Sequence, residues 1–314
     1  MNSTFTLSGK RVFVAGHRGL VGSAIVRRLA SENVNVITAT RTELDLRDTA
    51  KTLEWFKANK PDVVYLAAAK VGGIQANSLY PADFLGENLA IQQAVIGSAA
   101  QTDVQKLVFL GSSCIYPKLA PQPISEDSLL TGPLEPTNEW YAIAKIAGLK
   151  YCAALRRQYG KDFVSAMPTN MYGPNDSYDL NNSHVLPALM RKIHAAKVKG
   201  ENEVVMWGTG KPRREFMHAD DCADALIHVA MHYSDEAPIN IGTGEDVEIS
   251  ELAEILARVI GFKGKFTHDL SKPDGTPRKL QDVKKLHGLG WKHKISLEEG
   301  CARTYQDFLK LNLA

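Results

Sequence analysis

Short apolar runs alternate with longer amphipathic stretches in the first half of the chain. Each apolar run is too short for a buried helix, so we expect five strands, at residues 11–15, 34–38, 62–66, 106–110 and 163–167. The stretches between them follow a helical period at 20–31, from 48 onward, at 81–101 and at 139–159. This alternation is typical of βαβ units, and it predicts an α/β fold with a Rossmann-type, doubly wound parallel sheet.

The rhythm changes after Pro168. Asn, Asp, Ser and Pro residues cluster over 170–182 and indicate a loop. Helical patterns then return at 184–197, 220–233, 249–260 and 297–311, and a glycine-rich turn at 208–212 favours a hairpin. We therefore expect a cofactor domain and a smaller, mixed α/β substrate domain. The first covers 1–167 and is rejoined by about 217–243, and the second covers 168–216 and 244–314.

Composition narrows the class of protein. The 314 residues are 44% hydrophobic and 23% charged, with a net charge of +2 and no basic stripe, which argues against nucleic acid as a partner. The four cysteines are widely spaced and form no C-x-x-C pair, so neither a zinc site nor another metal is expected, and a reducing cytoplasm fits. The sequence shows neither a signal peptide nor an apolar run of membrane-spanning length.

A glycine-rich segment stands between the first expected strand and the first expected helix. It reads Gly16-His17-Arg18-Gly19-Leu20-Val21-Gly22. This spacing allows a tight turn, the close approach of a pyrophosphate and contact between that group and the N–H groups that begin a helix. An ordinary glycine-rich turn is the alternative, but the strand and helix on either side favour dinucleotide binding.

The end of the second expected strand indicates which dinucleotide is bound. NAD sites place Asp or Glu there for the ribose 2′-hydroxyl, whereas this chain has Ala39-Thr40-Arg41. A guanidinium binds phosphate through two parallel hydrogen bonds, so Arg41, helped by Arg18, predicts the 2′-phosphate of NADP(H). Asp45 is a candidate contact for the adenine. Solvated surface arginines are the alternative interpretation.

A second pattern predicts chemistry at a carbonyl group. Tyr141 and Lys145 are four residues apart and share one face of a helix. A nearby ammonium stabilises a phenolate and is expected to bring the phenol pKa closer to neutral. Ser112, at the end of the fourth expected strand, could donate a hydrogen bond to the same carbonyl oxygen.

At this point the chain resembles the GDP-L-fucose synthases, a family of extended short-chain dehydrogenase/reductases. The matching segments span nearly the whole chain: 15–22, 67–73, 111–118, 135–138, 141–148, 167–174, 182–184 and 272–280. The resemblance implies conversion of GDP-4-keto-6-deoxy-D-mannose to GDP-L-fucose, by epimerisation at C3 and C5 followed by NADPH-dependent reduction at C4. It also implies Cys114 as base, His184 as acid and Tyr141 as proton donor, with Lys145 tuning the tyrosine and touching the nicotinamide ribose.

Cys114 and His184 have alternative interpretations. A free cysteine is more often a small buried hydrophobic residue than a base. Alternation along a strand, however, would turn Cys114 to the same side as Ser112. The other cysteines, Cys152, Cys222 and Cys301, are expected in the core. His184 could instead have only a hydrogen-bonding role at the start of a helix.

The resemblance further implies contacts for both ligands. Cofactor contacts are expected along the glycine loop and at later strand ends: Gly16, His17, Arg18, Gly19, Leu20, Val21, Gly22, Arg41, Asp45, Leu46, Leu110, Gly111, Ser112, Ser113, Lys145, Pro168, Asn170, Met171 and His184. Contacts to the GDP-sugar are expected from Lys192, Trp207, Arg214, Asp274 and Lys279, although relatives often have arginine in place of Lys192. A homodimer packed through the helices near 81–101 and 139–159 is also implied.

Three alternatives stay open. A 4-epimerase or 4,6-dehydratase with retained NAD would share Ser112, Tyr141 and Lys145, but it predicts an acid near residue 39 and needs no Cys114–His184 pair. A reductase acting on a 3,6-dideoxy sugar is harder to separate from the main hypothesis. A non-catalytic NADP-binding sensor could keep the glycine loop but would have no need of Tyr141 and Lys145.

Overall fold

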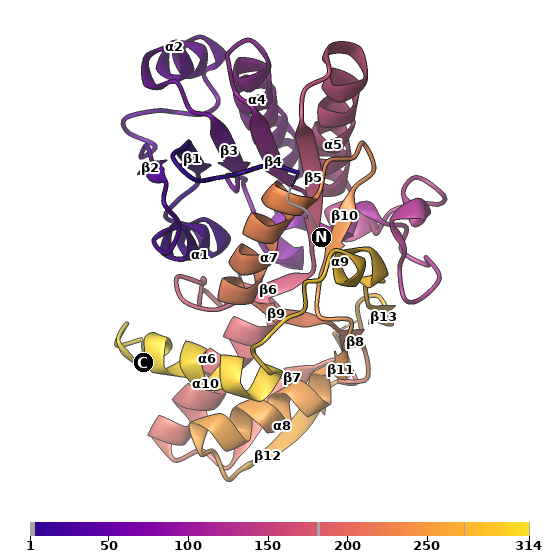
Figure 1. The fold of residues 1–314 in the computed structure, drawn as a ribbon. Helices are drawn as coiled ribbons and strands as arrows, with labels where there is room; N and C mark the ends of the chain where they lie inside the picture. Colours follow the sequence, from indigo (N-terminus) through magenta and orange to yellow (C-terminus); the bar gives the residue numbers. More distant parts are fainter. Residues whose placement is uncertain (1–3, 181–182, 273, 314) are drawn as a thin grey trace.

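A six-stranded parallel sheet forms the centre of the upper lobe in Figure 1. The computed structural model describes residues 4–180, 183–272 and 274–313, so Asn182 and Pro273, within two of the matching segments, lie outside the described residues. The strand order is β10-β5-β4-β3-β1-β2. The strands are β1 (Arg11–Ala15), β2 (Asn35–Ile37), β3 (Val63–Leu66), β4 (Lys106–Leu110), β5 (Phe163–Pro168) and β10 (Ile239–Ile241). The predicted α/β fold with a doubly wound parallel sheet is confirmed.

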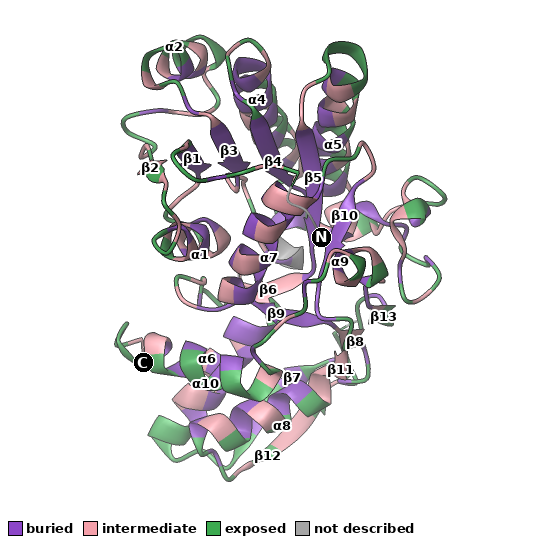
Figure 2. Ribbon diagram, viewed as in Figure 1, coloured by how far each residue is buried: buried purple, intermediate pink, exposed green. Residues whose placement is uncertain are grey.

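Both faces of the sheet are covered by helices. One face packs against α1 (Leu20–Leu29) and α7 (Ala219–His232), and the other against α2 (Thr49–Asn59), α4 (Pro81–Ala100) and α5 (Glu139–Tyr159). In β1, Val12 and Val14 enter the first core, whereas Phe13 and Ala15 enter the second. Because side chains alternate and both faces are buried, such strands are continuously apolar, as Figure 2 shows for β1, β3, β4 and β5.

The chain returns to the sheet after it has left it. We expected residues near 217–243 to do so, and they form α7 followed by β10, which pairs in parallel with β5. The lower lobe in Figure 1 has a separate core, built by α6 (Val185–Lys199), α8 (Ile249–Ile260), α10 (Leu297–Leu309), β7 (Glu203–Trp207) and β12 (Lys265–Asp269). The division of the chain into two domains stays a prediction.

The expected hairpin around 208–212 is wrong. β7 pairs in parallel with β12, while β8 (Arg213–Arg214) pairs with β11 (Val247–Glu248) and β13 (Arg278–Lys279). The turn is instead fixed from outside, because the Asp274 carboxylate accepts hydrogen bonds from the Thr209 backbone N–H and hydroxyl at 2.9 and 2.7 Å. The two strands that flank the turn therefore belong to different sheets.

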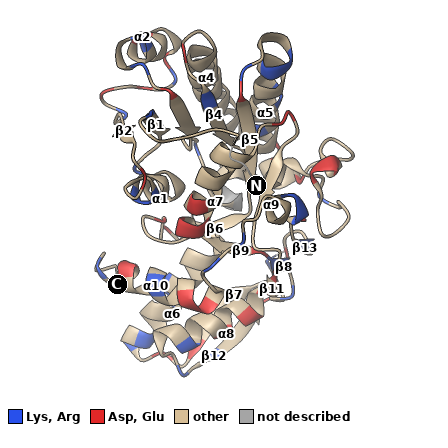
Figure 3. Cartoon of the chain, viewed as in Figure 1, with Lys and Arg blue, Asp and Glu red and all other residues tan. Residues whose placement is uncertain are grey.

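Several short elements lie between the long ones. The remaining strands, β6 (Asn170–Tyr172) and β9 (Phe216–His218), pair in parallel and link the two lobes. The remaining helices are α3 (Ile74–Leu79), α9 (Lys284–Gly288), and three 3₁₀ turns, η1 (Ser113–Ile115), η2 (Glu126–Ser128) and η3 (Pro136–Asn138). Acidic and basic residues are interspersed along the ribbon (Figure 3). Of the helices within residues 4–313 that the structure describes, none combines the length and apolarity needed to cross a membrane.

Candidate active site

The glycine loop makes the turn that a dinucleotide site requires. Gly16 has a φ of +88°, and a Cβ there would lie 2.7 Å from the backbone nitrogen of Ala68. A Cβ on Gly22 would lie only 2.0 Å from the Gly16 oxygen, whereas at Gly19 it would meet nothing closer than 3.5 Å. Gly16 and Gly22 thus fix the turn and the helix packing. Gly19 is the N-cap residue of α1 and has no side chain to cap the helix. The N–H groups of the first helical turn therefore remain available for a phosphate.

Charged side chains surround the loop after β2. Arg41 is 70% exposed, and its guanidinium lies 3.9 Å from the Glu87 carboxylate. Glu87 also pairs with Arg47, which in turn binds Asp45 at 2.6 Å. The Arg47 hydrogen bonds hold the pKa of Asp45 down to about 2. Arg41 therefore projects freely enough to meet a phosphate, while Asp45 is already engaged by Arg47.

An acid that sequence reasoning missed folds back onto the end of this strand. Glu43 accepts hydrogen bonds from the Thr40 backbone N–H at 2.7 Å and from the Thr40 hydroxyl at 2.8 Å. Those bonds, together with the charges of Arg18 and His17, lower the pKa of the Glu43 carboxyl. The end of β2 itself carries no acid, as the sequence indicates, but the turn after it brings the Glu43 carboxylate back to Thr40.

The carboxyl end of β4 leads directly into the reacting group. Cys114 lies in the 3₁₀ turn η1 and not in a strand, so the argument from strand alternation is wrong. The side-chain oxygen of Ser112 caps this turn by accepting a hydrogen bond from the Cys114 backbone N–H at 3.2 Å. Both side chains still lie close to the Tyr141 phenol, because both influence the pKa of that phenol.

Burial dominates the titration of Tyr141 and Lys145. The Lys145 ammonium donates a hydrogen bond to the Leu110 carbonyl at 2.7 Å and lies 5.8 Å from the Tyr141 ring centroid. Its burial lowers the Lys145 pKa to about 7. Burial raises the pKa of the Tyr141 phenol, with the charge of Cys114 adding to the effect and the Ser112 hydrogen bond opposing it. The expected lowering of the Tyr141 pKa by Lys145 is therefore not seen, because a lysine with a pKa near 7 is only partly charged at neutral pH.

Cys114 is surrounded by hydrogen-bond donors. The Asn138 amide nitrogen donates to the Cys114 sulfur at 3.2 Å, and the Lys279 ammonium donates to it at 3.7 Å. The other three cysteines are buried, as expected, and burial raises the pKa of each of their thiols. Cys114 is thus the one described cysteine that combines partial exposure with polar partners.

The candidate substrate residues form a second group. The Lys192 ammonium lies 4.9 Å from the Trp207 ring centroid, and Lys272 approaches the same ring at 5.5 Å. Trp207 is 57% exposed, so much of this indole is accessible to a ligand. Arg214 donates a hydrogen bond to the Thr276 carbonyl at 2.6 Å, and the negative charge of Asp274 acts to raise the pKa of its guanidinium. Burial lowers the pKa of both Lys192 and Arg214.

The remaining candidate residues differ in the contacts that they make. His184 immediately precedes α6 and, among the described residues, makes no side-chain hydrogen bond to the reacting group. Desolvation lowers the pKa of its imidazole, although the residue as a whole is exposed. A Cβ on Gly111 would collide with Met167, and the Asn170 amide donates to the Glu215 carbonyl at 2.8 Å. The cofactor roles of all the residues expected to contact it, Leu46, Ser113, Pro168 and Met171 among them, stay predictions.

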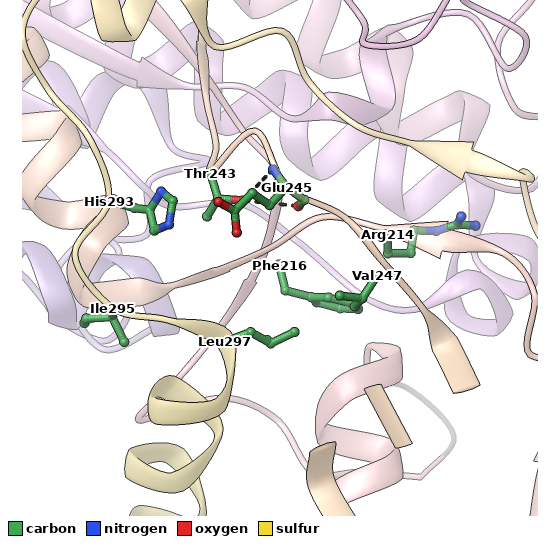
Figure 4. Close-up of a pocket in the computed structure, with 8 residues that line it drawn as sticks. All are labelled: Arg214, Phe216, Thr243, Glu245, Val247, His293, Ile295 and Leu297. Atoms are coloured by element: carbon green, nitrogen blue, oxygen red, sulfur yellow. Dashed lines mark hydrogen bonds between the residues drawn. The ribbon is translucent and has the colours of Figure 1, made fainter. Parts of the chain in front are cut away.

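A small cavity lies beside the site but does not form it. It is lined by Arg214, Phe216, Thr243, Glu245, Val247, His293, Ile295 and Leu297, and Figure 4 shows the Arg214 guanidinium at the end farthest from His293 and Ile295. Its volume of about 50 Å³ is far below the roughly 300 Å³ that small-molecule sites occupy. No cluster of His, Cys, Asp or Glu suited to a metal ion occurs in the parts of the chain that the structure describes.

The glycine turn after β1 and the Ser, Tyr and Lys side chains near the end of β4 define a dinucleotide-dependent enzyme. The model of the NAD dependent epimerase/dehydratase family matches residues 12–242. A GDP-L-fucose synthase of Sinorhizobium fredii is 56% identical over 97% of each chain. One of Escherichia coli is 55% identical over 97% of this chain and 98% of its own. The chain belongs to the NAD dependent epimerase/dehydratase family and, within it, to the GDP-L-fucose synthases.

A solved structure agrees with this assignment. The GDP-mannoheptose C4 reductase of Campylobacter jejuni, solved with NADP bound, superposes with a TM-score of 0.88 at 37% identity. The superposition covers 97% of this chain and all of that one. The similarity therefore extends through the lower lobe as well as the sheet.

Proposed function

We propose that the protein converts GDP-4-keto-6-deoxy-D-mannose to GDP-L-fucose, by epimerisation at C3 and C5 followed by NADPH-dependent reduction at C4. The observation that supports this best is the position of Cys114. Its thiol shares one site with Ser112 and Tyr141, and it is held there by the Asn138 and Lys279 donors. A reductase needs only the Ser, Tyr and Lys group, so a donor-lined thiol beside that group favours a second, epimerising step.

The epimerisation follows from the acidity of the sugar. The protons at C3 and C5 are both α to the C4 ketone, so a base can remove either one as the electron pair moves onto the C4 oxygen. Cys114 as thiolate takes the proton, and His184 returns one to the opposite face. Ser112 and Tyr141 stabilise the enolate oxygen by hydrogen bonding, which is the main contribution expected of such donors.

The reduction uses the same donors on the same oxygen. NADPH, when bound, supplies the hydride that adds to C4. Tyr141 delivers the proton to the C4 oxygen, since the phenol is protonated at neutral pH, and its raised pKa in the absence of ligands makes it a weaker acid than a free phenol. Lys145, one helical turn further on, lies 5.8 Å from the Tyr141 ring centroid and hydrogen bonds the Leu110 carbonyl at the end of β4.

Two sets of residues would hold the ligands. The open N–H groups at the start of α1 suit the cofactor pyrophosphate, and Arg18 and Arg41 suit its 2′-phosphate. Arg214, Lys192 and the exposed indole of Trp207 suit a nucleoside diphosphate, since they offer cationic donors beside an aromatic ring. Asp274 fixes the turn that follows Trp207.

The decisive experiment supplies the purified protein with NADPH and GDP-4-keto-6-deoxy-D-mannose. We expect NADPH to be oxidised and the product to be GDP-L-fucose. Absence of NADPH oxidation would contradict the proposal. In deuterated water the parent should incorporate deuterium at C3 and C5, and Cys114→Ser should lose this incorporation, whereas Cys152→Ala, which removes a buried thiol from α5, should retain it. Incorporation by Cys114→Ser at the parent rate would exclude Cys114 as the base.

We further propose a homodimer in the cytoplasm. The four cysteines are all free, which suits a reducing compartment. The dimer would pack through α4 and α5, which expose several small and apolar side chains.

A further inference from the structure

Lys279 reaches the thiol that the proposed mechanism uses as its base. Its ammonium lies 3.7 Å from the Cys114 sulfur, and Asn138 lies 3.2 Å away with its amide nitrogen. The two donors come from distant parts of the chain, β13 and the end of η3. A cation and a second hydrogen bond at one sulfur are the surroundings that stabilise a thiolate over a thiol.

The Lys279 backbone is held by strand pairing and by the anchored residues that follow it. Lys279 pairs with Arg214 across β13 and β8. Two residues further on, the Gln281 backbone N–H donates to the buried Glu215 carboxylate at 3.0 Å, and the Gln281 amide donates to the Met167 carbonyl at 2.8 Å. The ammonium is therefore delivered to Cys114 by a strand anchored in the core of the molecule and not by a loose surface loop.

Other charged groups also face this thiol. Arg214, on β8, and the Tyr141 phenol, on α5, lie close enough to Cys114 for it to influence the pKa of each. Glu135 acts on Arg214, but it is itself paired with Lys118 at 3.1 Å. Of these groups, Lys279 is the one whose cationic nitrogen hydrogen bonds the sulfur.

We propose that Lys279 is a positioning residue that keeps Cys114 as a thiolate in the resting enzyme, with Asn138 as its helper. The thiol proton leaves to solvent, and the sulfur is then ready to take a proton from C3 or C5 of the sugar. This proposal rests on the proposed function, because it assigns a partner to the base of that reaction. It goes further in making the basicity of Cys114 depend on a residue expected to contact substrate.

The test measures the thiolate directly, without turnover. Iodoacetamide alkylates thiolates, and peptide mass spectrometry separates Cys114 from the three buried cysteines. In Lys279→Met the pH midpoint of Cys114 alkylation should rise by about one unit or more, and Lys279→Arg should restore the parent midpoint. Lys284→Met, which removes an exposed lysine five residues away, should leave it unchanged.

An unchanged midpoint in Lys279→Met would overturn the proposal. If that variant fails to fold by circular dichroism, Asn138→Ala provides the second test, and it should raise the midpoint by a smaller amount; no rise there would also overturn the proposal. The readout needs no GDP-sugar, so its outcome is distinct from that of the proposed function. A shifted midpoint with no NADPH oxidation would reject the function alone, and turnover with no shift would reject the role of Lys279 alone.

Discussion

At the scale of single residues, Lys145 illustrates how a functional group can oppose stability. Its ammonium is buried, with the Leu110 carbonyl as a neutral partner, and burial lowers its pKa from 10.5 to about 7. In the unfolded chain the same group takes up a proton up to a much higher pH. Burial of Lys145 therefore lowers the free energy of unfolding by its full amount below about pH 7. This loss of stability becomes smaller as the pH rises from 7 towards 10.5.

Replacing Lys145 by Met should remove this penalty together with the catalytic function. We expect Lys145→Met to be more stable than the parent at pH 7, and the difference to shrink by about 2 kcal/mol between pH 7 and pH 9. Urea unfolding of both proteins at the two pH values gives the measurement, and groups common to both cancel. A stability difference independent of pH would show that Lys145 titrates normally in the folded state.

Arg41 is the residue on which the choice of dinucleotide is expected to depend. Its guanidinium is mostly exposed near the end of β2. The Glu87 carboxylate, which could compete with a phosphate for it, lies 3.9 Å away. Arg41→Ala should weaken NADPH binding by about tenfold or more, the value of a lost charged hydrogen bond, and leave NADH binding nearly unchanged. Fluorescence titration with each dinucleotide measures this. Lys51→Ala, at another exposed cation, is the control, and equal losses for both dinucleotides would refute the role of Arg41.

What the sequence predicts at this scale depends on separation along the chain. Tyr141 and Lys145 can be paired from their spacing alone, because a helix brings residues four apart onto one face. The Cys114 contacts could not be predicted, since Asn138 and Lys279 are 24 and 165 residues away and meet only in the folded molecule. Glu43 was missed for a related reason, because a local turn and not a strand returns it to Thr40.

At the scale of elements, length decided what could be predicted. The long helices α4, α5 and α8 have a full apolar period, and their predicted bounds agree with the structure to within one residue. The two-residue strands β8, β11 and β13 have no period to detect. They form because the buried Glu215 joins the segments around them, accepting hydrogen bonds from the backbone N–H groups of Thr243, Gly244 and Gln281 at 2.7, 2.8 and 3.0 Å.

The Glu215 carboxylate should therefore be needed for the region that places Arg214 and Lys279. In Glu215→Gln one carboxylate oxygen becomes an amide donor that faces a backbone N–H, so a buried donor is left without an acceptor. We expect a loss of about 1 to 3 kcal/mol in the free energy of unfolding. Glu245→Gln, at an exposed site in the adjoining turn, should cost far less. Similar unfolding midpoints for the two variants in urea would show that Glu215 is not a structural anchor.

At the scale of the whole molecule, the sheet and the lower lobe depend on each other through chain segments that cross between them. The chain leaves the sheet after β5, builds β6 and α6, and returns through β9, α7 and β10. The sequence could predict this return because α7 and β10 repeat the helix–strand rhythm of the first half. It could not predict the pairing of β6 with β9, which joins two three-residue strands into one ladder.

The outward face of α4 and α5 is the surface through which we expect two copies of the chain to associate. Several exposed positions there are small or apolar, interrupted by the exposed charges of Asp83 and Lys150: Ala82, Gly86, Leu89 and Gln93 on α4, and Trp140, Ile143, Ala147 and Ala154 on α5. Small residues let helices approach closely, and exposed apolar stripes of this kind usually mark an interface. Together with the resemblance, this favours a second copy of the chain as the occupant.

A charge in the middle of this stripe should separate the two copies. We expect the parent to have about twice the 34.5 kDa mass of one chain by light scattering, and Ala147→Glu to have the mass of one, because a carboxylate is costly to bury in an apolar contact. Val198→Glu, at an exposed position on α6, should leave the dimer intact. A monomeric parent, or a dimer that persists in Ala147→Glu, would place the interface elsewhere or exclude it. Because α5 also bears Tyr141 and Lys145, separation should lower turnover as well, by loosening the helix that positions the phenol against the carboxyl end of β4.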